Sequence, residues 1–439
     1  MEKIIGIRRE DKNEWERRTP LIPEHVKELK EQFGIKTILQ PSKIRIFTDD
    51  EYKEVGAEIN ESLKQANPIF AVKEIPVEFF EPEKTYVFFS HTIKGQEYNM
   101  DMLKRMMDLK VNLIDYERII DENNRRLIFF GRYAGLAGMI ETLNAFGQKL
   151  KLQGYNTPFE KIKQAYEYSS LEEAKEHIKQ IGEEIEDKGF PQELAPIVVG
   201  FAGYGNVSRG AQEIFDLLPH KVVSPNIIEE MYENFSGDIL NLYKVVFKEE
   251  DMVELKEKSK ISGFDLQDYY NNPEKYKSKF SRYIPYLKIL VNCIYWTEKY
   301  PRLVTKQYVR DNSIIKSNLN LRVIGDISCD IEGSIEITQK ATYPDNPCFT
   351  YFGKEDRFED GIHSEGITVM AIDNLPCEFS KESSTEFSNV LKNYVNEIVE
   401  EDFNVDFKDL KLSYPLKKAL ILHNGRLTED YKYMEKFIK

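Results

Sequence analysis

Four polar side chains that can transfer protons follow directly after short apolar runs in the first third of the sequence. They are Lys73, Glu74, His91 and Glu117. Short apolar runs are typical of buried strands, and the carboxyl ends of parallel strands meet at one edge of a sheet, where ligands bind. Burial and crowding at such an edge lower the pKa of a lysine and keep histidine near neutrality. The group therefore predicts acid–base chemistry around one bound molecule.

Each of these residues also has a structural explanation. A lone histidine at a strand end is more often a hydrogen-bonded structural residue, and Lys73 beside Glu74 could be a surface ion pair worth less than about 1 kcal/mol. Asp326 and Asp330, which follow a later apolar run, could stabilise turns. We predict no metal site, because the six histidines are scattered and the four cysteines form no Cys-x-x-Cys pair.

Two arginines lie in a charged loop just beyond the first apolar run, in Glu14-Trp-Glu-Arg-Arg-Thr-Pro-Leu-Ile-Pro. A guanidinium such as that of Arg18 can hold a substrate carboxylate through two hydrogen bonds. The chain as a whole is acidic, with 61 Lys and Arg against 75 Asp and Glu and a net charge of −14. An anionic substrate would therefore need a locally cationic site.

The acidic composition also narrows the class of protein. Nucleic acid and anionic membranes are not expected as partners, because both require a basic surface. No apolar stretch approaches the roughly 18 residues of a membrane-spanning helix. The cysteine usage favours a reducing compartment, so we expect a cytoplasmic protein.

A glycine-rich segment, Pro196-Ile-Val-Val-Gly-Phe-Ala-Gly-Tyr-Gly-Asn-Val-Ser, predicts a nucleotide site. An apolar strand runs into the two glycines, and a helix follows. One glycine permits a tight turn, the next lets backbone amides approach a pyrophosphate, and the helix N-terminus adds donors. The alternative is an ordinary turn that needs glycines. The expected cofactor-binding residues are Gly203, Gly205, Asn206 and Val207, with Ser208 in the usual place of a third glycine.

The choice of dinucleotide depends on the residue about twenty positions after this turn. An acid there binds the ribose 2′-hydroxyl of NAD and repels a 2′-phosphate. Here Ser224 occupies that place, and Arg209 and Lys221 lie near it in the sequence. This favours NADP(H) over NAD(H). The alternative is that Glu229 or Glu230 supplies the carboxylate.

Strands alternate with helices along the chain, which predicts an α/β fold with parallel sheets. In the first third, strands are expected at 4–7, 37–40, 69–72, 85–90, 111–115 and 127–130, with helices opening at Pro23 and around 100–107. A second set of strands is expected at 197–202, 221–223, 287–293, 321–327 and 367–371, with helices at 134–151 and after Lys381. Residues 160–195 and 225–285 read as insertions.

Eight segments resemble the alanine dehydrogenase/transhydrogenase N-terminal family. Within it, the chain is most similar to the lysine–ketoglutarate reductase branch, the saccharopine dehydrogenases that form lysine. Ser-His-Thr-Ile-Lys at 90–94 and Asp-Ile-Ser-x-Asp at 326–330 separate that branch from alanine dehydrogenase. The matching segments are 6–23, 88–96, 113–117, 130–139, 203–212, 292–296, 325–336 and 372–376.

The resemblance implies two Rossmann-like domains with a cleft between them. Residues 1–131 and about 336–439 would form the substrate domain, and 132–335 the NADP-binding domain. Lys73 and His91 would be the acid–base pair, and Arg18 would hold a substrate carboxylate. The remaining implied site residues are Glu74 and Glu117, which tune the site, Arg132 and Asp330 at the substrate, and Asp326 near the nicotinamide.

The activity implied by the resemblance is the reductive condensation of L-lysine with 2-oxoglutarate to saccharopine. Alternatives are an alanine dehydrogenase-like amino-acid dehydrogenase and a catalytically silent, transhydrogenase-like nucleotide-binding subunit. Because the sequence ends at Lys439, we expect a separate saccharopine-oxidising dehydrogenase to perform the next step.

Overall fold

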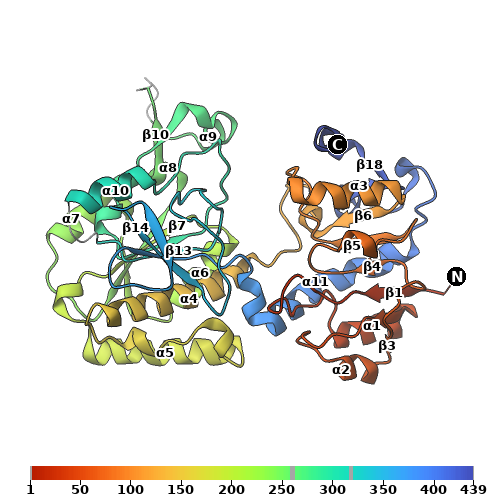
Figure 1. Ribbon diagram of the computed structural model, residues 1–439, viewed down its shortest axis with the longest axis horizontal. Helices are drawn as coiled ribbons and strands as arrows, with labels where there is room; N and C mark the ends of the chain where they lie inside the picture. The colour runs from red at the N-terminus through yellow and green to blue at the C-terminus, as the bar shows by residue number, and fades with distance from the viewer. Residues whose placement is uncertain (1, 258–262, 316–319, 439) are drawn as a thin grey trace. The chain divides into compact units, whose positions relative to one another are not determined.

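The chain forms two compact units, each built around its own sheet (Figure 1). The structure is a computed structural model that describes residues 2–257, 263–315 and 320–438. Unit 1 comprises Met1–Phe130 and Ser380–Lys439, and unit 2 comprises Gly131–Phe379. We expected the chain to return to the first unit near residue 336. It returns at Ser380, because three further strands between 348 and 370 belong to the sheet of unit 2.

The sheet of unit 1 has eight strands in the order β18-β17-β6-β5-β4-β1-β2-β3. They are β1 (Ile4–Ile7), β2 (Lys36–Leu39), β3 (Glu58–Ile59), β4 (Ile69–Phe70), β5 (Thr85–Phe88), β6 (Asn112–Asp115), β17 (Leu420–His423) and β18 (Arg426–Leu427). The first six are parallel, as predicted, whereas β17 pairs antiparallel with β6. The C-terminal segment thus completes the sheet that the N-terminal segment begins.

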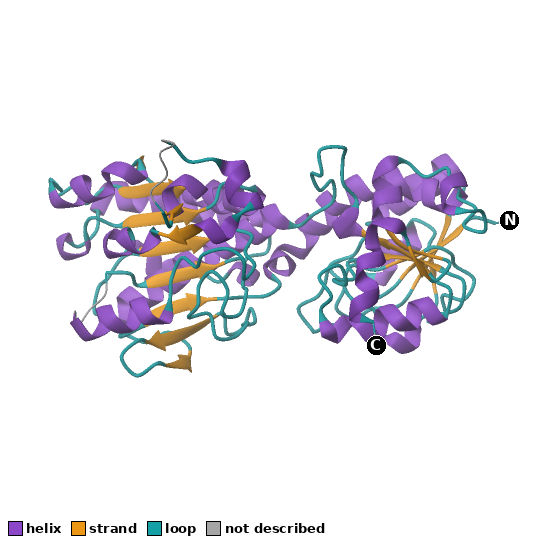
Figure 2. Ribbon diagram, turned by 90° about the horizontal axis from the view of Figure 1, so that it is seen from above, coloured by secondary structure: helices purple, strands orange, loops and turns teal. Residues whose placement is uncertain are grey.

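Helices lie on both sides of this sheet (Figure 2). They are α1 (Pro23–Phe33), α2 (Asp49–Glu54), α3 (Met100–Asp108), α11 (Ser380–Glu400) and α12 (Tyr414–Ala419). The predicted limits of α1 are confirmed: Pro23 opens it, and Gly34 ends it with a φ of 67°. The Ser388 hydroxyl of α11 accepts a hydrogen bond from the Ile22 amide at 3.0 Å and lies 2.6 Å from Nδ1 of His25. Helix α11 is therefore fixed to the start of α1.

The strand expected at 127–130 is wrong. These residues form a bend and a loop. Strand β17 occupies the outer edge of β6, so no free edge remains there for another strand. The apolar side chains are buried without pairing: Ile128 lies in the core, and the Phe130 ring stacks on Phe387 with centroids 4.6 Å apart.

The sheet of unit 2 also has eight strands, in the order β15-β14-β16-β13-β12-β7-β9-β8. They are β7 (Val198–Ala202), β8 (His220–Val222), β9 (Leu242–Phe247), β12 (Ile289–Asn292), β13 (Val323–Asp326), β14 (Cys348–Phe352), β15 (Arg357–Asp360) and β16 (Ile367–Met370). Strands β8, β9, β7, β12, β13 and β16 are parallel, and β14 and β15 are antiparallel additions. A separate small sheet pairs β10 (Val253–Leu255) with β11 (Tyr276–Ser278).

Alternate residues of β7 pack into two apolar clusters, as expected for a sheet buried on both faces. Val199 and Phe201 pack in a cluster with residues of α4 and α6, whereas Val198 and Ala202 pack in a second cluster. The helices of unit 2 are α4 (Gly131–Leu152), α5 (Leu171–Lys188), α6 (Asn206–Phe215), α7 (Ile228–Glu233), α8 (Glu249–Met252), α9 (Leu266–Asn271) and α10 (Lys306–Ile315).

The interpretation of 225–285 as an insertion is wrong for β9, which lies inside the sheet between β7 and β8. Lys244 interrupts its apolar pattern. The lysine stem is buried, and its ammonium reaches the Asp216 carboxylate just beyond α6 at 2.6 Å. This tertiary contact allows a charged residue in a central strand.

Each sheet has one strand at which the order reverses, so that the connections to its two neighbours run to opposite sides. In unit 1, β1 lies between β2 and β4, and in unit 2, β7 lies between β9 and β12. The loops at the carboxyl ends of strands diverge at such a point and leave room for a ligand. These two points position the candidate site residues. Among the helices that the structure describes, none is long and apolar enough to cross a membrane.

Candidate functional site

A buried carboxylate joins the loops that follow β1 and β4. Oε1 of Glu10 accepts a hydrogen bond from the Val72 amide at 2.6 Å, and Oε2 accepts one from the Lys73 amide at 2.9 Å. Burial raises the pKa of Glu10 to about 7, and the charge of Glu16 contributes, although the two amides oppose the shift. Glu10, in the loop after β1, thus fixes the backbone of Lys73, the predicted catalytic lysine.

The Lys73 side chain lies partly buried at this edge of unit 1. Burial lowers the pKa of its ammonium, and the nearby positive charges of Arg18 and Lys12 lower it further. Across residues 2–257, 263–315 and 320–438, no hydrogen bond or ion pair involves Nζ of Lys73. The charges of Glu16 and Glu74 oppose this shift without cancelling it. A buried lysine of lowered pKa gives up its proton more readily, as a general base requires.

His91 and Glu74 form a hydrogen-bonded pair, with Nδ1 of the ring 2.6 Å from Oε1 of the carboxylate. Burial raises the pKa of Glu74, but the hydrogen bond and charge of His91 and the charges of Lys12 and Lys73 outweigh it and bring it to about 2. An ionised Glu74 accepts the proton on Nδ1 and so leaves Nε2 for exchange with a ligand. His91 also has a φ of 48°, a strained backbone of the kind that accumulates at functional sites.

A second buried acid connects the loops that follow β5 and β6. Asp115 accepts hydrogen bonds from the amides of Ser90 at 3.1 Å and Glu117 at 2.8 Å, and from the Ser90 hydroxyl. Burial raises its pKa to about 6, and the charge of Glu117 acts in the same direction. Glu117 itself pairs with Arg126. The structure therefore places Glu117 beside Asp115 at the end of β6.

Arg18 is buried and held by Glu16. Nε donates to Oε1 at 2.8 Å and Nη2 donates to Oε2 at 2.6 Å. The guanidinium lies 4.2 Å from the centroid of the Phe130 ring. Its plane is thus fixed by an acid and an aromatic face, which is the preorganisation that carboxylate recognition needs. The predicted contact with a substrate carboxylate stays a prediction.

In unit 2, the glycine turn follows β7 as predicted. Gly203 has a φ of 96°, and its amide donates to the Phe247 carbonyl at the end of β9 at 3.0 Å. A Cβ on Gly205 would have no atom within 4 Å, and no side chain caps the start of α6. The amides of Asn206 and Val207 begin that helix. An open glycine before uncapped helical amides suits a pyrophosphate, so these residues fit a dinucleotide.

Close packing of α6, the role of a third glycine, belongs to Gly210 rather than to position 208. A Cβ on Gly210 would lie 2.1 Å from the Arg132 carbonyl, and a Cβ on Gly135 of α4 would lie 1.9 Å from the Val207 carbonyl. The two helices therefore touch backbone to backbone. Ser208 is buried, and its hydroxyl accepts a hydrogen bond from Nε2 of the Gln212 side chain at 2.9 Å.

The other predicted residues of unit 2 have internal partners. Asp326 is fully buried and accepts hydrogen bonds from Asn292 at 2.8 Å and Thr338 at 2.6 Å, and burial raises its pKa to about 6. Arg132 donates twice to Glu213, at 3.0 and 2.8 Å. The Asp330 carbonyl closes a turn by accepting from the Gly333 amide at 2.9 Å. The side-chain contacts of Asp326 and Arg132 explain these two residues as structural, and the backbone turn at Asp330 assigns no role to its carboxylate. The ligand roles of all three stay predictions.

The structure does not place Ser224 beside the glycine turn. Ser224 follows β8, the edge strand, and β9 separates β8 from β7. The serine hydroxyl donates to Asn226, and Lys221 pairs with Asp238 at 2.5 Å. The spacing of about twenty residues leads to the wrong residue because β8, the next strand along the chain, is not the neighbour of β7 in the sheet. The residues at the end of β9 lie beside the glycine turn instead.

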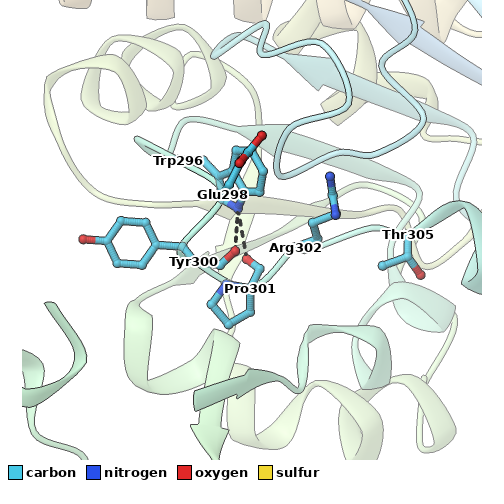
Figure 3. A pocket seen from close by; sticks show the side chains of 6 residues that line it. All are labelled: Trp296, Glu298, Tyr300, Pro301, Arg302 and Thr305. Atoms are coloured by element: carbon cyan, nitrogen blue, oxygen red, sulfur yellow. Dashed lines mark hydrogen bonds between the residues drawn. The ribbon is translucent and has the colours of Figure 1, made fainter. Parts of the chain in front are cut away.

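A pocket of about 500 Å³ opens in the loop after β12 (Figure 3). The Trp296 indole donates to the carbonyls of Tyr300 at 3.0 Å and Pro301 at 3.3 Å, and the Arg302 guanidinium lies 5.3 Å from its ring centroid. The indole is used within the loop, and the Arg302 guanidinium donates to the carbonyls of Glu332 at 2.9 Å and Gly333 at 3.1 Å in the loop after β13. In the described part of the chain, no three His, Cys, Asp or Glu side chains are grouped to hold a metal ion.

Reasoning from the sequence missed three acids at the edge of unit 1, namely Glu10, Glu16 and Asp115. The first two lie in a loop rich in arginine and lysine, where acids normally form solvated pairs. Asp115 is the last residue of a strand, and position at a strand end was the signal that identified Lys73 and His91.

Comparisons with known proteins agree with the resemblance. The family models for the N-terminal and C-terminal domains of alanine dehydrogenase/PNT match residues 6–137 and 266–430, together more than half of the chain. An Arabidopsis thaliana protein, alpha-aminoadipic semialdehyde synthase, is 39% identical over 99% of this chain, which spans 42% of that protein. Saccharopine dehydrogenase [NAD(+), L-lysine-forming] of Yarrowia lipolytica is 24% identical over 86% of this chain and 87% of its own.

A solved L-alanine dehydrogenase has the same fold, with a TM-score of 0.60 at 16% identity over 99% of this chain and 98% of that one. The two domain models occur in family order, and both units have parallel-dominated α/β sheets. The chain belongs to the alanine dehydrogenase/PNT family.

Proposed function

We propose that this protein is a lysine–2-oxoglutarate reductase, which condenses L-lysine with 2-oxoglutarate and reduces the product to saccharopine. The observation that carries the proposal is the group at the edge of unit 1: the partly buried Lys73, whose amine has a lowered pKa, beside the hydrogen-bonded His91 and Glu74. The similarity to the Arabidopsis synthase and the Yarrowia dehydrogenase supports the choice of substrates.

The reaction needs proton transfers at two stages. The ε-amine of lysine adds to the keto carbon of 2-oxoglutarate, and a proton must leave nitrogen while another reaches the new hydroxyl. Water then leaves to give an imine. We assign these transfers to Lys73, which is poised to lose a proton, and to Nε2 of His91, whose other nitrogen Glu74 holds. Positioned groups of this kind typically contribute about 10²–10⁴-fold.

Saccharopine carries three carboxylates, and Lys12 and Arg18 at the edge of unit 1 are cations that can attract them. Lys12 lies 3.8 Å from Glu74, and the charges of Lys12 and Arg18 both act on Lys73. We propose that Arg18, fixed by Glu16, binds one substrate carboxylate. Glu117 and Asp115 would tune the charge of this edge.

A nicotinamide dinucleotide, when bound, supplies the hydride that reduces the imine carbon. We propose that unit 2 binds its pyrophosphate through the amides of Gly205, Asn206 and Val207. The preference for NADP(H) was predicted from Ser224, and the position of Ser224 at the end of an edge strand does not support it.

Oxidation of NADH and NADPH by purified protein tests the proposed function. Turnover is expected only when L-lysine and 2-oxoglutarate are both present. Turnover with pyruvate and ammonia instead would indicate an alanine dehydrogenase activity. Dinucleotide binding without turnover on either substrate pair would indicate a silent binding subunit and would refute the proposal.

A further inference from the structure

Two neighbouring cations lie at the amino ends of the central strands of unit 2, on the edge of the sheet opposite the glycine turn. Lys288 directly precedes β12, and Arg322 directly precedes β13. The parallel register pairs Ile289 with Val323, and the Arg322 amide donates to the Lys288 carbonyl at 2.9 Å. The two side chains therefore start from adjacent positions of adjacent strands, and their like charges repel each other.

Lys149, near the end of α4, brings a third positive charge to this edge. Its side chain is fully buried, and Nζ donates to the hydroxyl of Thr368 at 3.3 Å, while the Thr368 amide donates to the Arg322 carbonyl at 3.0 Å. Burial lowers the pKa of Lys149 to about 7 and that of Lys288 to about 8, and the charge of Arg322 acts in the same direction on both. The exposed Glu365 opposes the shift at Lys149 without cancelling it.

The guanidinium of Arg322 has no acid to neutralise it. Within the described part of the chain, no hydrogen bond or ion pair involves this group, and its Nε is buried without an acceptor. Burial lowers its pKa, and the hydroxyls of Tyr155 and Tyr232 oppose that shift. Because buried donors in folded proteins almost always have an acceptor, Nε marks the place of an acceptor that the described residues do not supply.

Asn320 adds a second donor at the same place. Its Oδ1 accepts a hydrogen bond from Nζ of Lys288, which leaves Nδ2 as the free end of the amide. Nδ2 is close enough to the Tyr232 hydroxyl to oppose the rise that burial causes in the pKa of that tyrosine, yet Nδ2 is buried and meets no acceptor in hydrogen-bonding geometry. Both unmatched atoms, Nε of Arg322 and Nδ2 of Asn320, are donors. Unmatched donors among cations require an anion.

The number of charges favours a doubly charged oxyanion. A phosphate group carries about −1.5 to −2 at pH 7 and offers several strong acceptor oxygens, two of which the fork of an arginine can bind together. A carboxylate would bring one charge and two oxygens. Lys288 gives one of its three protons to Asn320 and keeps two for a ligand, whereas Lys149 uses its protons on carbonyls and contributes only its charge.

We propose that Lys288, Asn320 and Arg322 form a binding site for phosphate or for the phosphoryl group of a small molecule. The four residues of β12 separate this site from the loops at the other end of the sheet by about 13 Å. The proposed dinucleotide site and the proposed reaction therefore take no part in it, and the inference does not rest on the proposed function.

Calorimetry of the full chain at constant ionic strength tests the inference. Inorganic phosphate should bind saturably with a dissociation constant of about 1 mM or below, and sulfate should bind in the same range. Acetate, which carries one charge, should bind about tenfold more weakly or worse. Glycerol 3-phosphate identifies the source of the phosphoryl group: tighter binding than inorganic phosphate indicates an organic phosphate, and weaker binding indicates the free ion.

Arg322→Met distinguishes a ligand site from a structural role. Because Nε has no acceptor within the described residues, the variant should be at least as stable as the wild type in phosphate-free buffer, and its phosphate affinity should fall about tenfold or more. Arg310→Met is the matched control. Arg310 is also a partly exposed arginine of unit 2, but it pairs with Asp356. Its substitution should leave the phosphate affinity within about twofold.

Chemical modification locates the site in the wild type, so the test does not depend on the folding of a variant. Phosphate at ten times its dissociation constant should slow the reaction of phenylglyoxal with Arg322 about tenfold, measured by peptide mass spectrometry, and should leave Arg310 unprotected. Four results would overturn the inference. They are no saturable phosphate binding, equal affinities for phosphate and acetate, an unchanged affinity in Arg322→Met, and no protection of Arg322. A protein without reductase activity would leave all of these measurements unaffected.

Discussion

Replacing Gly205 with alanine should weaken dinucleotide binding without weakening the fold. Gly205 has a φ of −75°, which alanine adopts freely, and a Cβ there would have no atom within 4 Å. The change should leave the free energy of unfolding equal or raise it by about 0.4–1 kcal/mol, because the unfolded chain loses freedom. The new methyl group would stand where the pyrophosphate must approach the backbone. We expect the dissociation constant to rise about tenfold or more, which is about 1.4 kcal/mol.

The contrasting variant is Gly210→Ala. Its Cβ would lie 2.1 Å from the Arg132 carbonyl, a backbone atom that cannot move alone. Overpacking of this kind costs about 1–3 kcal/mol, so urea unfolding should shift to lower concentration. Fluorescence titration and urea denaturation of both variants check the pair. A Gly205→Ala protein that is as stable as the wild type and binds dinucleotide equally well would refute the assigned role of the turn.

Three further predictions concern the core of unit 2 and the edge of unit 1. Lys149→Met should lower the free energy of unfolding by about 1–3 kcal/mol in urea, since Nζ donates to three carbonyls at 2.8, 3.0 and 2.8 Å that would lose their donor; an unchanged free energy of unfolding would contradict this. Burial raises the pKa of Glu141 to about 8 beside the buried Glu378. The folded state therefore holds a proton that the unfolded state releases above about 4.5, so stability should fall as pH rises from about 4.5 to about 8 and level off above that. Glu141→Gln should flatten that pH profile, and an unchanged slope would show that the carboxyl does not titrate there. Lys73→Met and His91→Gln should each lower kcat about 10²–10⁴-fold while dinucleotide affinity stays within twofold; a collapse of affinity would place these residues at the nucleotide instead.

Apolar periodicity and turn residues predicted those helices and strands that are formed by neighbouring residues in the sequence. The strand–turn–helix from Val198 to Phe215 follows from an apolar run, two glycines and an amphipathic segment, all read within twenty residues. Strand β9 could not be predicted in this way, because Lys244 interrupts the apolar pattern and is stabilised in the sheet by its ion pair with Asp216. Tertiary contacts therefore determine that β9 is the neighbour of β7. They also determine which residue lies next to the glycine turn.

In the candidate site, too, residues marked by a local pattern were predicted, whereas residues that depend on tertiary contacts were missed. Position after a strand identified Lys73 and His91, and the pairing of His91 with Glu74 follows from that placement. Glu10 was missed because its role lies in two backbone amides more than sixty residues away. A charged loop gives no sign in sequence that one of its acids will be buried. Leu127–Phe130 was misassigned because the chain's C-terminal segment occupies the strand edge it would need.

The most direct test of the proposed function is the identity of the product. Protein incubated with L-lysine, 2-oxoglutarate and a nicotinamide dinucleotide carrying a transferable deuteride should form one new compound, detected by mass spectrometry. Its mass should equal that of lysine plus 2-oxoglutarate, minus one water, plus one hydrogen and one deuterium. Oxidation of the dinucleotide without this product, or deuterated alanine formed from pyruvate and ammonia, would contradict the proposal that this protein is a lysine–2-oxoglutarate reductase.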